Sequence, residues 1–363
     1  MVSSGSILLS DIERPTRFRE DGFPIKEGFH KMMERPTVSI LTPTFNHERF
    51  IAECIESVLS QTYENWEMII VDDGSNDDTP EIVKRYNDPR IISIRKKNRG
   101  IDCLGENYNH ALRMAKGKYL LILEGDDFLP RNRIERQLPS FEDEGVVLSH
   151  GRYSYAYNKR MVTYPAPFKK DVLNNDPLGS AFKLFLQGFN PIGTQSVMIR
   201  KSALFEIGGF AQPRYLPLVD YPTWMKLALK GRFSFIPEVL GYWRRHGASV
   251  TINNNEQIFK GFLKYCDEFT ISFREELSRL GLDPFMKNRG PIAYLSLAWI
   301  KLSEKKWGEA LVFSKQSWSR KEVLGRTFKI KIIVGMLGAY LHWNIPGLFK
   351  SLLGRGFGTQ DLY

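Results

Sequence analysis

The sequence predicts an α/β protein with a mixed sheet flanked by helices, and three apolar runs in the first third of the chain carry this prediction. The runs occupy residues 38–43, 68–71 and 119–123, and each is rich in Ile, Val and Leu. Short runs of this kind, separated by helix-like stretches, are typical of buried parallel strands. Each run ends in acidic or small polar residues. Because ligands bind beyond the carboxyl ends of strands in an open α/β sheet, we expect the three endings to line one crevice.

The stretches between the runs have helical periodicity. Residues 49–60 carry apolar side chains at helical spacing, and residues 104–114 are amphipathic. Asp78 and Thr79, followed by Pro80, form a helix-start signal. This alternation of strands and helices predicts a doubly wound layout.

The pattern loosens after the third run, where strands and helices no longer alternate regularly. It predicts, in chain order, a helix at 133–141, tyrosine-rich strands at 146–164, a helix at 178–187, a helix at 220–229 and a strand pair at 233–237 and 239–244. Mixed strands and long loops fit a region that receives a second substrate better than a second nucleotide-binding half. We expect His150 and the tyrosines of this region to serve packing rather than ligand binding.

Residues 253–363 are expected to be helical, with a helical hairpin at 293–302 and 307–318. Residues 332–341 are the most hydrophobic stretch, but a membrane span needs roughly 20 apolar residues. Two interpretations stay open for this stretch, a buried core helix or a helix in the headgroup region of an anionic membrane. The second is motivated by flanking basic residues, which are Arg320, Lys321, Arg326, Lys329, Lys331, Lys350 and Arg355.

Composition places the chain among ordinary soluble proteins, with 363 residues, 42% hydrophobic and 25% charged. The formal net charge of +10 favours anionic partners. Three scattered cysteines without a CxxC pair indicate neither a disulfide framework nor a zinc site. Residues 1–36 are polar and broken by prolines, which predicts an N-terminal arm, and they lack a secretory signal. We therefore expect a cytoplasmic protein, with possible peripheral contact with the inner face of the plasma membrane.

The acidic residues after the third run suit a divalent metal. Glu124, Asp126 and Asp127 follow a buried strand, and the spacing across Gly125 lets two carboxylates face one site through a tight turn. Such a turn can hold a metal and leave coordination positions for phosphate oxygens, whose charge the metal neutralises when a diphosphate leaves. The alternative is that these acids only cap the next helix.

The first two endings suit a nucleoside. Asp72 and Asp73 can bond a ribose or a base, while Gly74 permits the turn. A plain helix-capping turn is the alternative for this segment. Residues 43–46 can present backbone groups to a nucleobase, with Phe45 as an apolar wall. His47 is expected to face solvent or to mark a helix start.

Together these motifs resemble the inverting nucleotide-sugar transferases of glycosyltransferase family 2, which have the GT-A fold. The resemblance rests on VSILTPTFN, SVLSQTYENWEMIIVDDGSNDDT, NRG, GENYNHAL and GKYLLILEGDD, and it extends to about Thr251. It implies a GT-A domain at 37–252, with a nucleotide half at 37–127 and an acceptor half at 128–252. Residues 253–363 would then form a helical C-terminal region.

The resemblance also implies site residues. Asp126 would be the ligand of Mn or Mg. LVDYPTWMKLALKG is similar to the family element that carries the catalytic base, which falls on Asp220. GYWRRHGAS is similar to the element that places Arg244 and His246 near the diphosphate. The nucleotide would be surrounded by Pro43, Thr44, Phe45, Asp72 or Asp73, Asn98, Gly100, Asn107, Glu124 and Gly125.

Two departures from the family pattern bear on these roles. Glu124 stands where the family has an aspartate, and Val219 stands where an acid precedes the base, so only Asp220 can serve. No QxxRW-like motif and no set of membrane spans is present, which favours single addition over processive synthesis.

The implied function is inverting transfer of a sugar, most simply from a UDP-sugar, to a hydroxyl of a glycan or lipid-linked acceptor in surface glycan or capsule assembly. The alternative is an inactive GT-A protein that binds a sugar nucleotide or a partner, although the joint presence of Asp126, Asp220, Arg244 and His246 argues for chemistry. A nucleotidyltransferase or dehydrogenase lacks support, because residues 42–47 contain no glycine and no GxGxxG follows a strand. No module for nucleic acid accompanies the positive charge.

Overall fold

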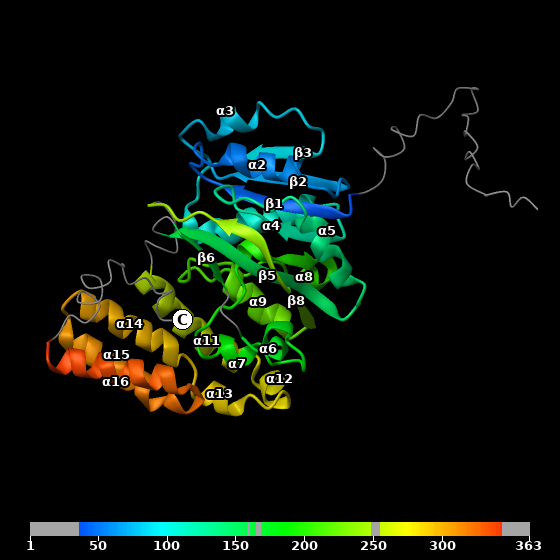
Figure 1. Cartoon of the computed structure of the whole chain (residues 1–363). Helices are drawn as coiled ribbons and strands as arrows, with labels where there is room; N and C mark the ends of the chain where they lie inside the picture. Colours follow the sequence, from blue (N-terminus) through cyan, green and yellow to red (C-terminus); the bar gives the residue numbers. More distant parts are fainter. Residues whose placement is uncertain (1–35, 158–159, 165–167, 248–254, 343–363) are drawn as a thin grey trace, which may run out of the picture.

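The computed structural model describes residues 36–157, 160–164, 168–247 and 255–342. They form an eight-stranded mixed sheet with helices packed against it, followed by a group of C-terminal helices (Figure 1). The α/β prediction with a flanked mixed sheet is confirmed. The arm expected at the N-terminus lies outside the described residues, apart from Pro36.

The sheet changes direction halfway across. Its strand order is β3 (Ile91–Arg95), β2 (Trp66–Asp72), β1 (Val38–Thr44), β4 (Tyr119–Ile122), β7 (Met198–Arg200), β5 (Val146–Tyr157) and β6 (Arg160–Tyr164), and β8 (Arg232–Trp243) pairs with β5. The first four are parallel, whereas β7 is antiparallel to β4. Strands β2 and β3 follow on one side of β1, whereas β4 lies on its other side, so the order of the strands reverses at β1. A ligand crevice is expected at such a reversal, where β1 and β4 end.

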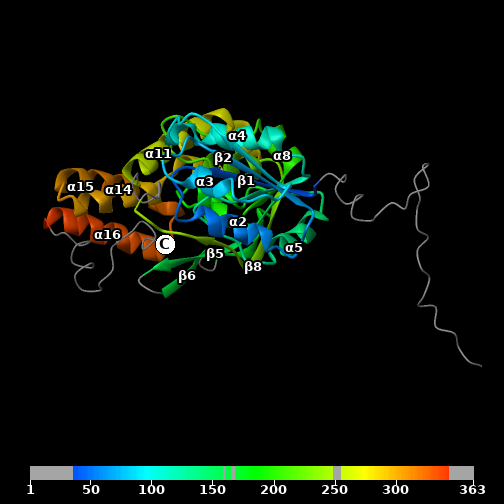
Figure 2. The ribbon, with the colours of Figure 1, turned by 90° about the horizontal axis from the view of Figure 1, so that it is seen from above.

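Strand alternation divides the core between two faces of the sheet. Val38 and Ile40 pack on one face with α2 (Ile51–Leu59). Leu41 packs on the other face, in a cluster with residues of α4 (Leu104–Met114) and α9 (Asp220–Ala228). Figure 2 shows α2 and α4 on opposite sides of β1 and β2. Shorter helices complete this part of the chain, namely α3 (Thr79–Val83), α5 (Arg133–Gln137), α6 (Lys170–Asn174), α7 (Phe182–Phe185) and α8 (Lys201–Glu206).

Some element predictions need correction. The strand pair at 233–237 and 239–244 was wrong, because these residues form one strand, β8. Pro237 and Glu238 lie at a register shift between Ile236 and Val239, so the proline sits in a bulge, where its missing N–H costs no ladder hydrogen bond. The helix at 178–187 shrinks to α7, the helix at 133–141 ends in a 3-10 turn after α5, and β3, β7 and α8 were not predicted.

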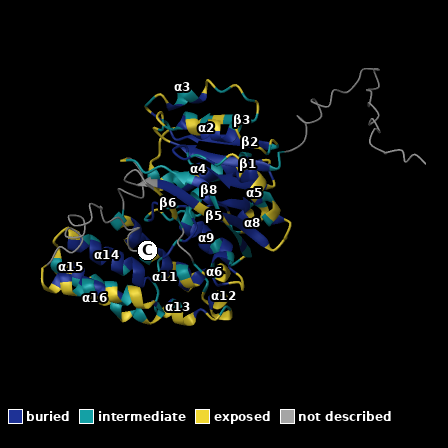
Figure 3. Ribbon diagram, viewed as in Figure 1, coloured by how far each residue is buried: buried dark blue, intermediate teal, exposed yellow. Residues whose placement is uncertain are grey.

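The C-terminal helices are α11 (Asn255–Ser272), α12 (Arg274–Arg279), α13 (Asp283–Lys287), α14 (Pro291–Ser303), α15 (Trp307–Ser319) and α16 (Arg326–Tyr340). Helix α11 packs on α9, with the Tyr221 and Phe262 ring centroids 4.7 Å apart. Helix α16 buries Ile332 and Ala339 and exposes apolar residues on another face (Figure 3). The buried face agrees with the core-helix interpretation, and the membrane interpretation stays a prediction. No helix in the described part of the chain combines the length and apolarity that crossing a bilayer requires.

Candidate active site

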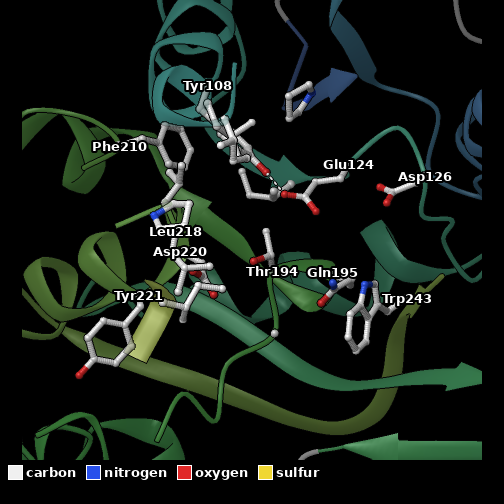
Figure 4. A pocket seen from close by; sticks show the side chains of 18 of the residues that line it. Tyr108, Glu124, Asp126, Thr194, Gln195, Phe210, Leu218, Asp220, Tyr221 and Trp243 are labelled. Carbon is white, nitrogen blue, oxygen red and sulfur yellow. Dashed lines mark hydrogen bonds between the residues drawn. The ribbon is translucent and has the colours of Figure 1, made fainter. Parts of the chain in front are cut away.

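A cavity of about 580 Å³ opens at the carboxyl ends of β1 and β4 (Figure 4). Residues from both predicted halves and from α11 line it. Most of the residues predicted for the site lie on its wall, namely Pro43, Thr44, Phe45, Asp73, Asn98, Gly100, Asn107, Glu124, Asp126, Asp220 and His246. Asp72, Gly125 and Arg244 do not line it.

The turn after β4 directs its first acid toward α4. The Tyr108 hydroxyl donates to the Glu124 carboxylate at 2.8 Å, as the dashed line in Figure 4 shows. Burial, together with the neighbouring charge of Asp126, raises the pKa of Glu124 to about 7. Asp126 lies on the other side of Glu124 from Tyr108 (Figure 4). The two acids therefore lie side by side on the cavity wall, with Glu124 bonded to α4.

Asp126 is the centre of a group of possible metal ligands. The His246 ring, through Nε2, lies 3.0 Å from Asp126 Oδ2. Ligand atoms of His47, Asp126 and His246 all lie within 4.8 Å of one another, and so do those of Glu124, Asp126 and Asp127. Sequence analysis placed His47 at a helix start or in solvent. Its carbonyl does accept hydrogen bonds at the start of α2, but its ring reaches the cavity.

Arg244 fastens the end of β8 to the acidic turn. Its backbone N–H donates to Asp127 Oδ1 at 2.9 Å, and its Nη1 donates to the Asp126 carbonyl at 3.1 Å. The guanidinium also pairs with Glu53 and lies 4.6 Å from the centroid of the Phe128 ring. These contacts hold the Arg244 guanidinium against the acidic turn and outside the cavity lining.

Asp72, the last residue of β2, and Asp73, which follows it, make different contacts. Asp72 Oδ1 accepts from the Ser75 backbone N–H at 2.9 Å and from the Ser75 hydroxyl at 2.6 Å, which closes the turn. Gly74 adopts φ 77°, and a Cβ there would lie 2.7 Å from the Asn98 backbone nitrogen. Only Asp73 of the pair reaches the cavity.

Asp220 begins α9, and its half-buried side chain lies in the cavity wall. Its Oδ2 accepts from the Asn190 side-chain amide at 2.7 Å, and its Oδ1 has no hydrogen-bond partner among the described residues. Burial raises the pKa of Asp220 to about 6. An oriented carboxylate with one oxygen facing the cavity is suited to accept a proton near neutral pH.

Other residues that line the cavity were not predicted from the sequence. Asn190, Thr194 and Gln195 come from a loop with no motif, and Trp243 ends β8. Tyr153, which the sequence assigned to packing, is buried and also lines the cavity. His150, by contrast, is buried away from the cavity, with Nε2 2.8 Å from the Leu173 carbonyl, as expected for a packing residue.

Comparison with known proteins identifies the family to which this chain belongs. A family model described as glycosyl transferase family 2 matches residues 39–205. An Escherichia coli UDP-Glc:alpha-D-GlcNAc-diphosphoundecaprenol beta-1,3-glucosyltransferase, WfaP, is 30% identical over 227 residues, which are 61% of this chain and 83% of WfaP. The chain belongs to glycosyltransferase family 2. This family 2 member is therefore a glycosyltransferase.

Solved structures agree with this glycosyltransferase in fold. Residues 1–349 of S. aureus TarS in complex with UDP-GlcNAc match with a TM-score of 0.51 and 16% identity, over 88% of this chain and 92% of that TarS chain. The mannosyltransferase PcManGT from Pyrobaculum calidifontis, in complex with GDP-Man and Mn2+, matches with a TM-score of 0.51 and 19% identity, over 89% of each chain. At these identities the likeness concerns the GT-A fold.

Proposed function

We propose that this transferase moves a sugar, with inversion, from a UDP-sugar to a hydroxyl of a glycan or lipid-linked acceptor, with Asp220 as general base and a divalent metal at Asp126. The observation that carries the proposal is that Asp126, Asp220 and the nucleotide-side residues share one cavity. WfaP, whose name states a UDP-Glc donor and a diphosphoundecaprenol-linked acceptor, supports the choice of UDP and of a lipid-linked acceptor.

The residues around Asp126 fit a divalent cation. A carboxylate oxygen and an imidazole nitrogen lie 3.0 Å apart, with both side chains mostly buried, and the cavity continues toward the nucleotide side. Mixed oxygen and nitrogen donors suit Mn²⁺ better than Mg²⁺, which prefers oxygen. A bound metal would neutralise charge on the departing diphosphate. Asp126 and His246 would hold it, and Asp73, Asn98 and Phe45 would contact the nucleoside.

Asp220 would act on the acceptor. The Asn190 amide fixes one carboxylate oxygen, so the other can take the proton of an acceptor hydroxyl. One displacement, with the base on the face opposite the leaving nucleotide, inverts the anomeric carbon. An inactive binding protein would have no use for this oriented and buried carboxylate.

UDP-sugars should stabilise the wild-type protein in a thermal-shift screen only when Mn²⁺ is present. A ligand at about 100 times its Kd adds about 2.7 kcal/mol to the free energy of unfolding. The Asp126→Ala variant should lose this shift, because it lacks the carboxylate that holds the metal. Asp171→Ala, which removes an exposed acid from α6, should keep it. The absence of any nucleotide response in the wild type would favour the inactive alternative.

We also propose that α16 contacts an anionic membrane. Its exposed apolar residues recur at helical spacing, with Ile330 51%, Ile333 41% and Leu337 52% exposed. The helix carries three basic residues and no acidic one (RTFKIKIIVGMLGAY), so its charge complements anionic lipid. The face that includes Ile332 is anchored in the protein, which leaves the other face for the bilayer.

Ile333→Glu combined with Leu337→Glu should abolish sedimentation with vesicles that contain anionic lipid, because both changes place charge on the exposed apolar face. Val312→Glu on α15, at a position that is 56% exposed, is the matched control and should sediment like the wild type. Equal sedimentation of the double variant and the wild type would refute the membrane contact, as would failure of the wild type to bind.

A further inference from the structure

The ring of His47 lies at the same corner of the cavity as Asp126 and His246. The His47 and His246 ring centroids are 6.2 Å apart, with the planes at 85°. Ligand atoms that lie about 2.1–2.3 Å from a shared ion are at most roughly 4.5 Å from one another. The three side chains, whose ligand atoms lie within 4.8 Å of one another, are therefore spaced almost as a coordination shell requires.

The backbone of His47 is fixed independently of its ring. Its N–H donates to Thr79 Oγ1 at 2.8 Å, and its carbonyl accepts from the N–H of Ile51 at 2.8 Å. On the preceding residue, the Asn46 N–H donates to Ser75 Oγ at 2.9 Å. The first residues of α3 and of α2 thus hold the His47 backbone, and the turn after β2 holds the residue before it. A side chain on such a fixed backbone is pre-organised for binding.

The orientation of the ring is also fixed. His47 Nδ1 lies 3.1 Å from Thr44 Oγ1, and metal-bound histidines are commonly oriented by such a neighbouring polar group. Gly125 leaves the space for this arrangement, because a Cβ at Gly125 would lie 2.5 Å from Thr44 Oγ1 and 2.9 Å from His47 Nδ1. The glycine of the acidic turn therefore lets the His47 ring approach the turn.

From this geometry we infer that His47 is a third protein ligand of the divalent cation, beside Asp126 and His246. The inference rests on the proposed function, because it concerns the same metal site. Two imidazole nitrogens with one carboxylate form a donor set that favours Mn²⁺ over Mg²⁺ more strongly than carboxylates alone. His47 would thus help to set which metal the enzyme uses.

Electron spin echo spectroscopy of the full chain with Mn²⁺ and UDP tests this inference directly, because it detects nitrogen bound to the metal. The wild type should show coupling to two imidazoles, and His47→Ala and His47→Gln should each show coupling to one. The Mn²⁺ dissociation constant should rise at least about tenfold in both variants, and the preference for Mn²⁺ over Mg²⁺ should fall. His47→Gln keeps a polar side chain beside Thr44 and so guards against loss of local structure.

His110→Ala is the control, because it removes a partly exposed histidine of α4 outside the His47, Asp126 and His246 group. Its nitrogen coupling and its Mn²⁺ affinity should equal those of the wild type. Unchanged coupling and affinity in both His47 variants would overturn the inference and leave the proposed function standing. If the wild type binds no Mn²⁺ in the presence of UDP, the metal-assisted function and the inference fail together.

Discussion

Replacing Asp220 with Asn should lower the rate of sugar transfer by about 10²–10⁴-fold, the range that a positioned general base contributes. Asparagine keeps the size of the side chain, and its carbonyl oxygen can still accept from Asn190, so donor affinity should not change. UDP release in the presence of acceptor measures the first quantity, and titration with UDP-sugar and Mn²⁺ measures the second. Unchanged turnover would remove Asp220 from its role.

The same substitution should make the protein more stable at neutral pH. Burial raises the pKa of Asp220 from 3.8 to about 6, so the folded state favours the protonated form and is destabilised as pH rises through this interval. Above pH 6 the buried charge costs about 3 kcal/mol, at 1.36 kcal/mol for each pKa unit. Asp220→Asn removes that cost. Its Tm should exceed that of the wild type at pH 8, and the two should converge near pH 4.

The pH dependence of the wild type follows from the same carboxyl group. If Asp220 is the base, as proposed, it must be ionised to accept a proton, and kcat/KM for transfer should increase as pH rises through about 6 and then level off. An activity that stays constant from pH 5 to pH 8 would show that no group with this pKa limits the reaction.

Replacing Arg133 with Ala should destabilise the protein by about 3–5 kcal/mol, the largest loss of stability that we expect from a single substitution. Arg133 is fully buried, and its guanidinium donates to the carbonyls of Gln195 at 2.6 Å and Val197 at 2.9 Å and to the Gln137 side chain at 3.0 Å. Alanine would remove the Arg133 donor from the Gln195 carbonyl and the Gln137 side chain, leave the Val197 carbonyl with only the N–H of Ile122, and open a cavity. The apparent Tm should fall by about 5 °C for a chain of this length.

Arg136→Ala on the same helix provides the control for Arg133. Arg136 is half exposed and pairs with Glu238 on the surface, so its loss should cost at most about 1 kcal/mol. Because Arg133 also holds the loop with Thr194 and Gln195 in the cavity wall, Arg133→Ala should weaken donor or acceptor binding as well. Equal Tm values for the two variants would contradict the structural role of Arg133.

Sequence periodicity sufficed for the strands that are buried on both faces. The runs at 38–43, 68–71 and 119–123 lie within or overlap β1, β2 and β4, and the helix at 104–114 coincides with α4. Strands β3 and β7 were not predicted, because neither has a continuous apolar run. Strand β3 is half-exposed, and β7 spans only Met198–Arg200. In β8 the proline at the bulge imitates a turn, since the sequence does not show that a neighbouring strand accommodates it.

The candidate site could also be predicted only in part from the sequence. Acids at strand ends could be predicted, because parallel strands bring their carboxyl ends together. The positions of three residues could not be predicted in this way. His47 is held near Asp126 by Thr44, whereas Asp72 and Arg244 are held outside the cavity by Ser75 and Asp127. These hydrogen bonds leave no periodic signal in the sequence. The loop with Asn190 and Gln195 has no regular sequence pattern, and its contact with Arg133, through the Gln195 carbonyl, joins residues 62 positions apart.

The contact between the end of β8 and the acidic turn joins positions 117 and 120 residues apart, Arg244 with Asp127 and His246 with Asp126. A nascent chain that has emerged only as far as β7 already carries three neighbouring acids, Glu124, Asp126 and Asp127, without these two partners. Because like charges repel, we expect this acidic turn to reach its final arrangement only after residues 244–246 have left the ribosome.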